Sequence, residues 1–413
     1  RFLEEGEIMQ RLGLKKQALE PNTSVDLDLN EYLKFKRSDS PDSEAAREYS
    51  DVELISVKLI PVGVGSLDEI TDLTGRVEDN RLVLKTDERE YILVFVYNER
   101  DFKSVFHGSP GADGPIMDHY KKEVVRRYLN RLLVIEKETG IPLSELIRAL
   151  FCDSIELGGS NWTDDMGEVF RARNGYDIAP YLPFVIQKPR RKPNFYETST
   201  EFADTLKRVQ YDFYNTIISV FLERFTTEFQ DFCTENGMLC RYQAYGTPYY
   251  MGLFQGYLIP DIPESNNWIY SGRDESHLSY YTWRQSQGYM LWNKAASTGA
   301  HIMGRKITSS EAFTNLGGVF RASLETIKQS DDMNFITGIN HAVLCGISYS
   351  PPEAGFPGWV RYGTYFSEFN SWWKYFSTWA GYNSRLCSVF QHSKPSAELA
   401  VLGRLRDFWG EVG

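Results

Sequence analysis

The sequence of 413 residues predicts an α/β fold, namely a decorated (β/α)8 barrel of the TIM type preceded by a β-rich section. About six strand-like runs alternate with helical runs beyond residue 100, as parallel strands joined by helices do. Several of these strands end in polar side chains, and barrel enzymes carry their chemistry at the carboxyl ends of their strands. No GxGxxG or GxxxxGK turn follows a strand, which disfavours an open nucleotide-binding sheet.

Two parts are expected, residues 1–100 and residues 101–413. The first 50 residues are polar and charge-rich, with a loop over 37–48. Short runs rich in branched and aromatic residues then predict strands, because turn residues separate them. The barrel fills the rest of the chain. Since Arg1 is no initiator residue and no signal peptide is visible, we expect a piece truncated at both ends, whose localisation stays unknown.

The elements of the barrel follow from hydrophobic spacing, Gly and Pro. Apolar residues recur every three or four positions over 116–139 and 200–236, which predicts helices that Gly140 and Gly237 end. Proline and basic residues over 180–193 predict an excursion from the core. We predict further helices over 166–174, 286–303, 320–329 and 367–389, strands over 147–152, 238–248, 306–314, 339–352 and 397–405, and loops over 258–268 and 272–277.

Composition excludes several classes of function. A net charge of −11 argues against nucleic acid, which needs a basic surface. No apolar run approaches ~18 residues, so no membrane span is expected. The five cysteines have no CxxC spacing and an odd number, which favours buried free thiols. Neither GxSxG nor HExxH occurs, so a serine hydrolase and a zinc peptidase are both disfavoured.

Polar side chains gather at the ends of the predicted strands and loops. Acids dominate, and a pair of opposed carboxyl groups suits cleavage of a glycosidic bond. Carboxylates with amides and carbonyls also suit Ca²⁺. Aromatic residues make up 14% of the chain, and their flat faces suit sugars. The clusters are Asp153–Glu156, Arg241–Gln243–Tyr245, Asp261–Glu264, Ser309–Ser310–Glu311 and Asn340–His341, and Trp162 and Trp372 are candidate sugar platforms.

Each of these residues has a structural alternative. Asp153 and Glu156 could form salt bridges or cap a helix, and His341 could satisfy a core hydrogen bond. Glu264 falls in a proline-rich loop in this interpretation. Trp162 and Trp372 are more often core residues than sugar platforms. Residues three apart on a regular strand point to opposite faces, so pairing Glu156 with the site requires a bend after Asp153.

Several blocks together resemble the α-L-rhamnosidases of glycoside hydrolase family 106. They are PGADGPIMDHY, FCDSIELGGSNWTDDMGEVFRARNGYDIAPYLP, RYQAYGTP, DIPES, AHIMGRKITSSEAFT, GINHAVLCGISYSPP and NSWW, and they span residues 110–373 in the order of the family. The DSxE…NWT and SSEAFT blocks are fairly specific in combination.

The resemblance implies an inverting, exo-acting glycosidase that removes terminal α-L-rhamnosides from plant-type polysaccharides or glycosides, in the periplasm or outside the cell. It implies Glu156 and Glu311 as the catalytic pair and Glu264 as a ligand of a Ca²⁺ near the sugar. We expect Asp153, Trp162, Arg241, Gln243, Asn340, His341 and Trp372 to bind substrate.

Two positions depart from the family pattern. Asn266 stands where a second acid is usual, and Cys345 stands where a histidine is usual. These departures leave a second reading open, a non-catalytic barrel that binds carbohydrate.

Overall fold

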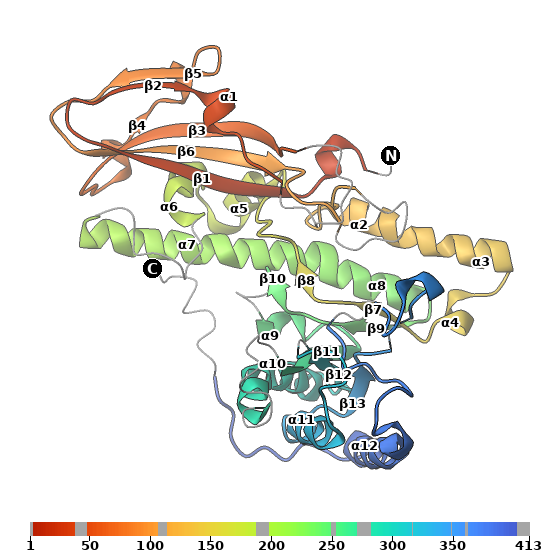
Figure 1. Cartoon of the computed structure of the whole chain (residues 1–413). Helices are drawn as coiled ribbons and strands as arrows, with labels where there is room; N and C mark the ends of the chain where they lie inside the picture. Colours follow the sequence, from red (N-terminus) through yellow and green to blue (C-terminus); the bar gives the residue numbers. More distant parts are fainter. Residues whose placement is uncertain are drawn as a thin grey trace. The chain divides into compact units, whose positions relative to one another are not determined.

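The structure of the chain is a computed structural model. It describes residues 3–37, 48–105, 114–186, 198–248, 253–270, 282–315, 317–347, 349–359 and 362–402 (Figure 1). The chain divides into two compact units. Residues 1–131, 156–228 and 403–413 form the N-terminal unit, and residues 132–155 and 229–402 form the parallel-sheet unit. Among the described residues, no helix is long and apolar enough to cross a membrane.

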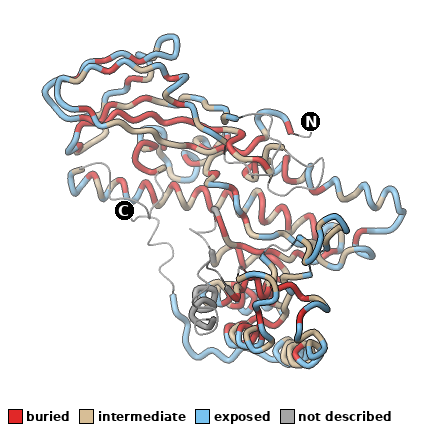
Figure 2. Tube along the Cα trace, viewed as in Figure 1, coloured by how far each residue is buried: buried red, intermediate tan, exposed pale blue. Residues whose placement is uncertain are grey.

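Two antiparallel sheets build the N-terminal unit. The larger has the order β1 (Gln10–Leu19), β6 (Tyr91–Arg100), β3 (Asp51–Pro61) and β4 (Thr71–Asp72), and the smaller pairs β2 (Ser24–Asp28) with β5 (Arg81–Lys85). Strand β6 is buried along almost its whole length (Figure 2). Strands β3, β5 and β6 confirm the predicted β-rich section. Strands β1 and β2 were missed, because their many charged residues predict a polar segment.

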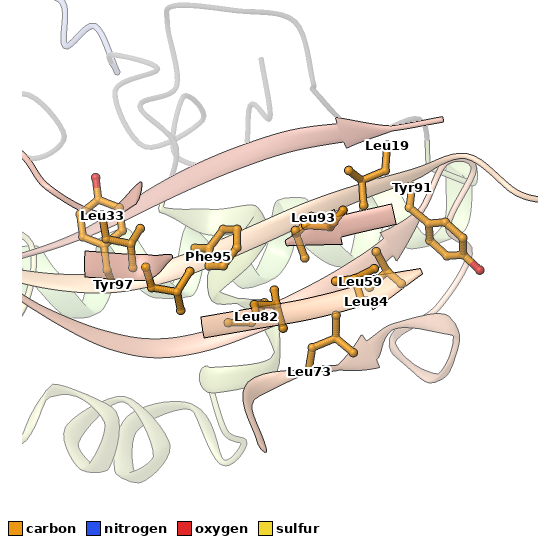
Figure 3. Packing of buried hydrophobic residues seen from close by; sticks show 13 residues of the cluster. Leu19, Leu33, Leu59, Leu73, Leu82, Leu84, Tyr91, Leu93, Phe95 and Tyr97 are labelled. Atoms are coloured by element: carbon orange, nitrogen blue, oxygen red, sulfur yellow. The ribbon is translucent and has the colours of Figure 1, made fainter. Parts of the chain in front are cut away.

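The core of this unit lies between the two sheets. Leu82 and Leu84 of β5 pack with Leu93 and Phe95 of β6 in one cluster (Figure 3). In both pairs, residues two apart on a strand share a face, so alternate side chains of each strand enter the core.

One helical run spans residues 200–235, as the spacing predicts. Ser199 caps it by accepting a hydrogen bond from the backbone N–H of Phe202, and Gly237 follows its end with a φ of 68°. Inside the run, one turn widens into a π-helix. The run comprises α7 (Thr200–Phe221), the π-turn η6 (Leu222–Thr226) and α8 (Thr227–Glu235).

Shorter helices complete both units. The predicted helix 116–139 is broken by a 3-10 turn into α2 (Lys122–Leu129), η4 (Asn130–Leu132) and α3 (Leu133–Thr139). The other short elements are η1 (Glu5–Glu7), α1 (Leu29–Tyr32), η2 (Leu67–Glu69), η3 (Thr74–Arg76), α4 (Leu143–Leu146), β8 (Ile155–Glu156), α5 (Met166–Asn174), η5 (Ala179–Tyr181), α6 (Leu182–Val185), β10 (Gly246–Thr247), α9 (Leu253–Gly256), η9 (Pro352–Ala354) and η10 (Trp373–Tyr375).

A five-stranded parallel sheet organises the second unit. Its strands are β7 (Ala149–Cys152), β9 (Leu239–Tyr242), β11 (Ile262–Tyr270), β12 (Ser309–Asn315) and β13 (His341–Leu344), and they lie side by side in chain order. Helices α10 (Thr282–Ile302) and α11 (Leu324–Ile336) pack against β11, and α12 (Phe376–Gln391) packs against α11 (Figure 1). This is a curled half-barrel of consecutive βα units. The parallel architecture is confirmed, whereas a closed ring of eight strands is not seen among the described residues.

Two predicted segments differ from the structure. Residues 258–268, expected as a loop because of their prolines, enter the central strand β11, since Pro263 fits there without breaking the pairing to β9. Residues 397–402, expected as a strand, form no strand, and Leu399, Val401 and Leu402 are 86%, 92% and 96% exposed. An apolar run therefore does not suffice to form a strand where no neighbouring strand pairs with it. The predicted loop 272–277 lies outside the described residues.

Candidate active site

The register of the parallel sheet sorts its side chains onto two faces. Glu264 pairs with Ser309 and Asn266 pairs with Glu311, so these four side chains share a face. On the opposite face, the Ser265 hydroxyl donates to the Asn293 side chain of α10, and the Ser330 hydroxyl of α11 donates to the Asn267 side chain. The helices therefore cover one face, and the polar residues of the candidate site lie on the other.

Glu264 lies at the centre of this polar face and is fully buried. Gln243 Nε2 donates to its Oε1 at 3.0 Å, and the Ser309 hydroxyl donates to its Oε2 at 2.5 Å. Arg241 Nε lies 3.1 Å from Oε2, and the guanidinium stacks 4.0 Å from the centre of the Phe151 ring. Burial raises the pKa of Glu264, and Arg241, Ser309 and Gln243 oppose that shift. A buried carboxylate is tolerated here because a cation and two donors surround it.

Glu311 is half-buried on β12, and neutral donors hold both of its oxygens. Gln243 Nε2 donates to Oε2 at 3.0 Å, and Asn266 Nδ2 donates to the same oxygen at 2.9 Å. The Thr314 hydroxyl donates to Oε1 at 3.1 Å. These contacts fix the carboxylate in one orientation and leave it without a salt-bridge partner among them. Such a group can accept a proton from water or a substrate hydroxyl.

Thr314 reaches Glu311 because the backbone between them is irregular. Residues three apart on a regular strand point to opposite faces. Phe313 has a φ of 71°, and the register between β11 and β12 shifts after Asn266. Left-handed backbone at a bulky residue is strained by about 1–3 kcal/mol. The fully buried Phe313 ring packs on Phe366 and Trp379, which compensates that strain.

Asp153 and Glu311 act on the same two side chains. Burial, followed by the Glu311 charge, raises the pKa of Tyr245, and Asp153 adds to this shift. Burial and the same two carboxylates raise the pKa of Cys345 to about 12. The Tyr245 ring meets the Trp292 ring edge-on at 4.5 Å. A neutral phenol and a neutral thiol therefore lie within the field of two acids.

Glu156 follows a bend in the chain, as its assignment requires. Strand β7 ends at Cys152, exposed Asp153 accepts the N–H of Ser154 at 2.6 Å, and β8 starts at Ile155. Gly246 has a φ of 94°, and a Cβ there would lie 1.9 Å from the Ile155 carbonyl oxygen, so only glycine admits this approach. The side chain of Glu156 is exposed.

Three of the predicted binding residues, Trp162, Asn340 and Trp372, make structural contacts of their own, whereas His341 pairs in register with Ser309 of the network. Trp162 belongs to the N-terminal unit, where it forms a backbone bridge with Gln10. Asn340 precedes β13 and accepts the N–H of Thr308, so it caps the amino ends of two strands. The Trp372 indole donates to the Ala322 carbonyl within an aromatic core cluster. His341 begins β13, and burial together with Arg148 and Arg241 lowers its pKa.

The donors around Glu264 do not fit a calcium site. Ca²⁺ takes oxygen ligands, whereas both oxygens of Glu264 accept hydrogen bonds or an ion pair from Gln243, Ser309 and Arg241. No group of three His, Cys, Asp or Glu side chains suitable for a metal ion occurs among the described residues. Calcium binding stays a prediction, and Glu264 is poorly suited to be one of its ligands because both of its oxygens already have partners.

Sequence reasoning proposed Asp153, Arg241, Gln243, Glu264 and Glu311, and it named Tyr245 only as a member of a polar cluster. Asn266, Thr314 and Tyr245 complete the network but were not assigned a role. The two-residue period of β11 contains the signal for Asn266, because Glu264 and Asn266 must face the same way once β11 is a strand.

Comparison with known proteins assigns the chain to a family. Residues 68–404 match the glycoside hydrolase family 106 profile, described as alpha-L-rhamnosidase. A protein named putative beta-glucuronidase from Formosa agariphila is 24% identical over 408 residues, which are 94% of this chain and 32% of that protein. The structure of a rhamnosidase from Novosphingobium sp. PP1Y has a similar fold, with a TM-score of 0.57, 22% identity, and coverage of 81% of this chain and 31% of that chain. The chain thus spans about a third of the length of these relatives. Because the family profile covers most of its residues, the chain belongs to glycoside hydrolase family 106, the α-L-rhamnosidase family.

Proposed function

We propose that the protein is an inverting, exo-acting glycosidase that removes terminal α-L-rhamnosyl groups from plant-type polysaccharides or glycosides. The observation that carries the proposal is the Glu311 carboxylate, which Gln243, Asn266 and Thr314 orient at the site face of the sheet. In this proposal Glu311 is the base that removes a proton from water as the water attacks the anomeric carbon. Inversion requires the acid and the base to lie ~6.5–9.5 Å apart so that water fits between them.

Glu156 is the proposed acid, which protonates the leaving oxygen. Its exposed side chain follows the bend at the end of β7. Asp153 is a second candidate, because it acts together with Glu311 on both Tyr245 and Cys345. In the preferred assignment Asp153 binds the sugar.

A neutral sugar suits the site better than a uronic acid. Arg241, the cation of this network, is already neutralised by buried Glu264. A sugar carboxylate would therefore meet Asp153 and Glu311 with no free positive charge supplied by Arg241. We propose a rhamnoside substrate over the glucuronide suggested by the name of the Formosa agariphila relative.

Three isosteric variants test the roles. E311Q and E156Q should each lower turnover of an aryl α-L-rhamnoside by at least 10³-fold, whereas D153N should weaken binding more than turnover. Circular dichroism and thermal melting establish that each variant is folded. A near-normal rate in E311Q would refute the base assignment, and a larger loss in D153N than in E156Q would identify Asp153 as the acid. NMR of the first-formed anomer tests inversion.

A non-catalytic carbohydrate-binding barrel is the second candidate, favoured by Asn266 and Cys345 in place of the usual residues. It predicts sugar binding by calorimetry with no product from a panel of aryl glycosides, including an aryl β-D-glucuronide.

A further inference from the structure

Two side-chain amides of the site have buried carbonyl oxygens without a partner. Gln243 is 0% exposed and Asn266 is 4% exposed. Within the described residues, no donor forms a hydrogen bond to Gln243 Oε1 or to Asn266 Oδ1. A buried acceptor left without a donor destabilises a protein, so a pair of them in one site calls for an explanation.

The orientation of both amides is fixed by the carboxylates. Gln243 Nε2 donates one hydrogen to Glu264 and the other to Glu311, which uses both of its N–H groups. Asn266 Nδ2 donates to Glu311. If either amide flipped, its carbonyl oxygen would face a carboxylate oxygen and no hydrogen bond would form. The two oxygens are therefore held where they can only accept, and they are directed away from the acids.

The chemistry of these oxygens defines the ligand. An acceptor pair requires hydrogen-bond donors, and the neighbouring Glu311 and Asp153 exclude an anion. Sugar hydroxyl groups are neutral donors of this kind. We propose that Gln243 Oε1 and Asn266 Oδ1 accept hydrogen bonds from hydroxyl groups of the terminal sugar, and that Asn266 is a specificity-determining residue. This inference rests on the proposed function, because it assumes that the site binds a sugar.

The arrangement joins recognition to positioning of the base. Each amide contacts the sugar through its oxygen and Glu311 through its nitrogen. A sugar that lacks the recognised hydroxyl leaves an unpaired carbonyl on the residue that holds the base. Asn266 suits this role where an acid would not, because a carboxylate at position 266 would lack the N–H and repel Glu311.

The test compares two variants that each remove one donor to Glu311. N266L removes the Nδ2 donor together with the unpaired carbonyl, whereas T314V removes only the hydroxyl donor. Calorimetry measures binding of L-rhamnose and its monodeoxy derivatives to wild type and to both variants. Deleting the recognised hydroxyl should weaken binding to wild type and T314V by about 3- to 10-fold, the equivalent of one neutral hydrogen bond, and should change nothing in N266L. N266A removes the same amide with a smaller side chain and should lose the discrimination in the same way, which covers the case in which N266L does not fold.

Several outcomes would overturn the inference. One is equal discrimination by N266L and wild type, and another is the absence of measurable rhamnose binding. A third is Ca²⁺ binding by wild type that N266L loses, because the oxygens would then serve a cation. The result is separable from the proposed function. If the protein distinguishes rhamnose from its deoxy derivatives but hydrolyses no glycoside, the proposed glycosidase activity is wrong and the hydroxyl-binding site stands. If it hydrolyses the aryl rhamnoside but does not distinguish these sugars, the activity stands and the hydroxyl-binding site is wrong.

Discussion

Gln243 Nε2 lies 3.0 Å from Oε2 of Glu311, and the same nitrogen lies 3.0 Å from Oε1 of Glu264. One neutral amide thus separates two carboxylates that would otherwise repel each other. It also ties the base proposed for catalysis to the buried ion pair beneath it.

Replacing Gln243 by leucine should therefore impair turnover. The variant loses both N–H donors and leaves Glu311 with Asn266 and Thr314 alone. We expect kcat on an aryl α-L-rhamnoside to fall by about 10²-fold, because the base is no longer held in one orientation. T314V removes a single donor from the same carboxylate and should have a smaller effect. Equal losses of kcat in the two variants would show that the Gln243 link between Glu264 and Glu311 contributes nothing beyond a single hydrogen bond to Glu311.

Removing one partner of the buried Arg241–Glu264 pair should destabilise the protein more than removing both charges. R241M leaves Glu264 buried and unpaired, which should destabilise the protein by about 3–5 kcal/mol. Burial already raises the pKa of Glu264, and the loss of Arg241 removes the opposing effect. The native state of R241M should bind a proton more tightly than the unfolded state, so its stability should fall as pH rises.

Urea unfolding at pH 5 and pH 8 measures this effect. The double variant R241M/E264Q has no buried charge at this position and should recover part of the lost stability, with no added pH dependence. If the double variant were as unstable and as pH-sensitive as R241M, the buried charge would not be the cause.

Phe313 provides a test of backbone strain. F313A and F313G both lose a buried ring, at about 3–5 kcal/mol. At a φ of 71°, however, glycine is relaxed and alanine is not. F313G should therefore be more stable than F313A by about 1 kcal/mol. At Phe366, which is buried in the same cluster without a positive φ, the order should reverse. Alanine outperforming glycine at position 313 would contradict the left-handed backbone.

Asp331 should make the parallel-sheet unit less stable above neutral pH. It is buried on α11, Asn383 Nδ2 donates to both of its oxygens at 3.0 Å, and burial raises its pKa to about 7. A raised pKa stabilises the fold below the unfolded value near 3.8, and this contribution is lost as pH rises to about 7. Melting at pH 5 and pH 8 should show a smaller difference in D331N than in wild type.

The neighbouring residue is a matched control for this prediction. The Asp332 side chain is 40% exposed and pairs with Lys328 at 2.6 Å. The Asp332 charge contributes less than burial to the raised pKa of Asp331, so D332N should reduce the pH dependence less than D331N does. A D331N curve parallel to that of wild type would exclude Asp331 as its source.

Hydrophobic spacing sufficed to predict most of the helices and the parallel strands. The stripe along residues 200–236 predicts the long helical run, and the polar ends of β9 and β12 indicate the site. Hydrophobic spacing gave wrong predictions where pairing between strands distant in the sequence overrides the local conformational preference. The prolines of β11 are typical of a loop, yet neighbours on both sides pair with the strand. Asn340 looks like a site residue in a linear pattern, and only the register places it at the amino ends of the strands.

Sequence-based assignment of the site residues was incomplete for a similar reason. A resemblance to a family supplies residues such as Glu156 and Glu311, but it says nothing about positions where the chain departs from the pattern. Asn266 looked like a missing acid in the sequence. In the fold it is the register partner of Glu311 and one of the donors that hold it.

Strand β11 separates two duties between its alternate residues. Ser265 and Asn267 attach it to α10 and α11, whereas Glu264 and Asn266 face the chemistry. An exchange at an even-numbered position can therefore alter which substrate is accepted while the strand stays anchored through its odd-numbered neighbours. Such a division lets selection explore new preferences by single steps, without first having to rebuild the scaffold.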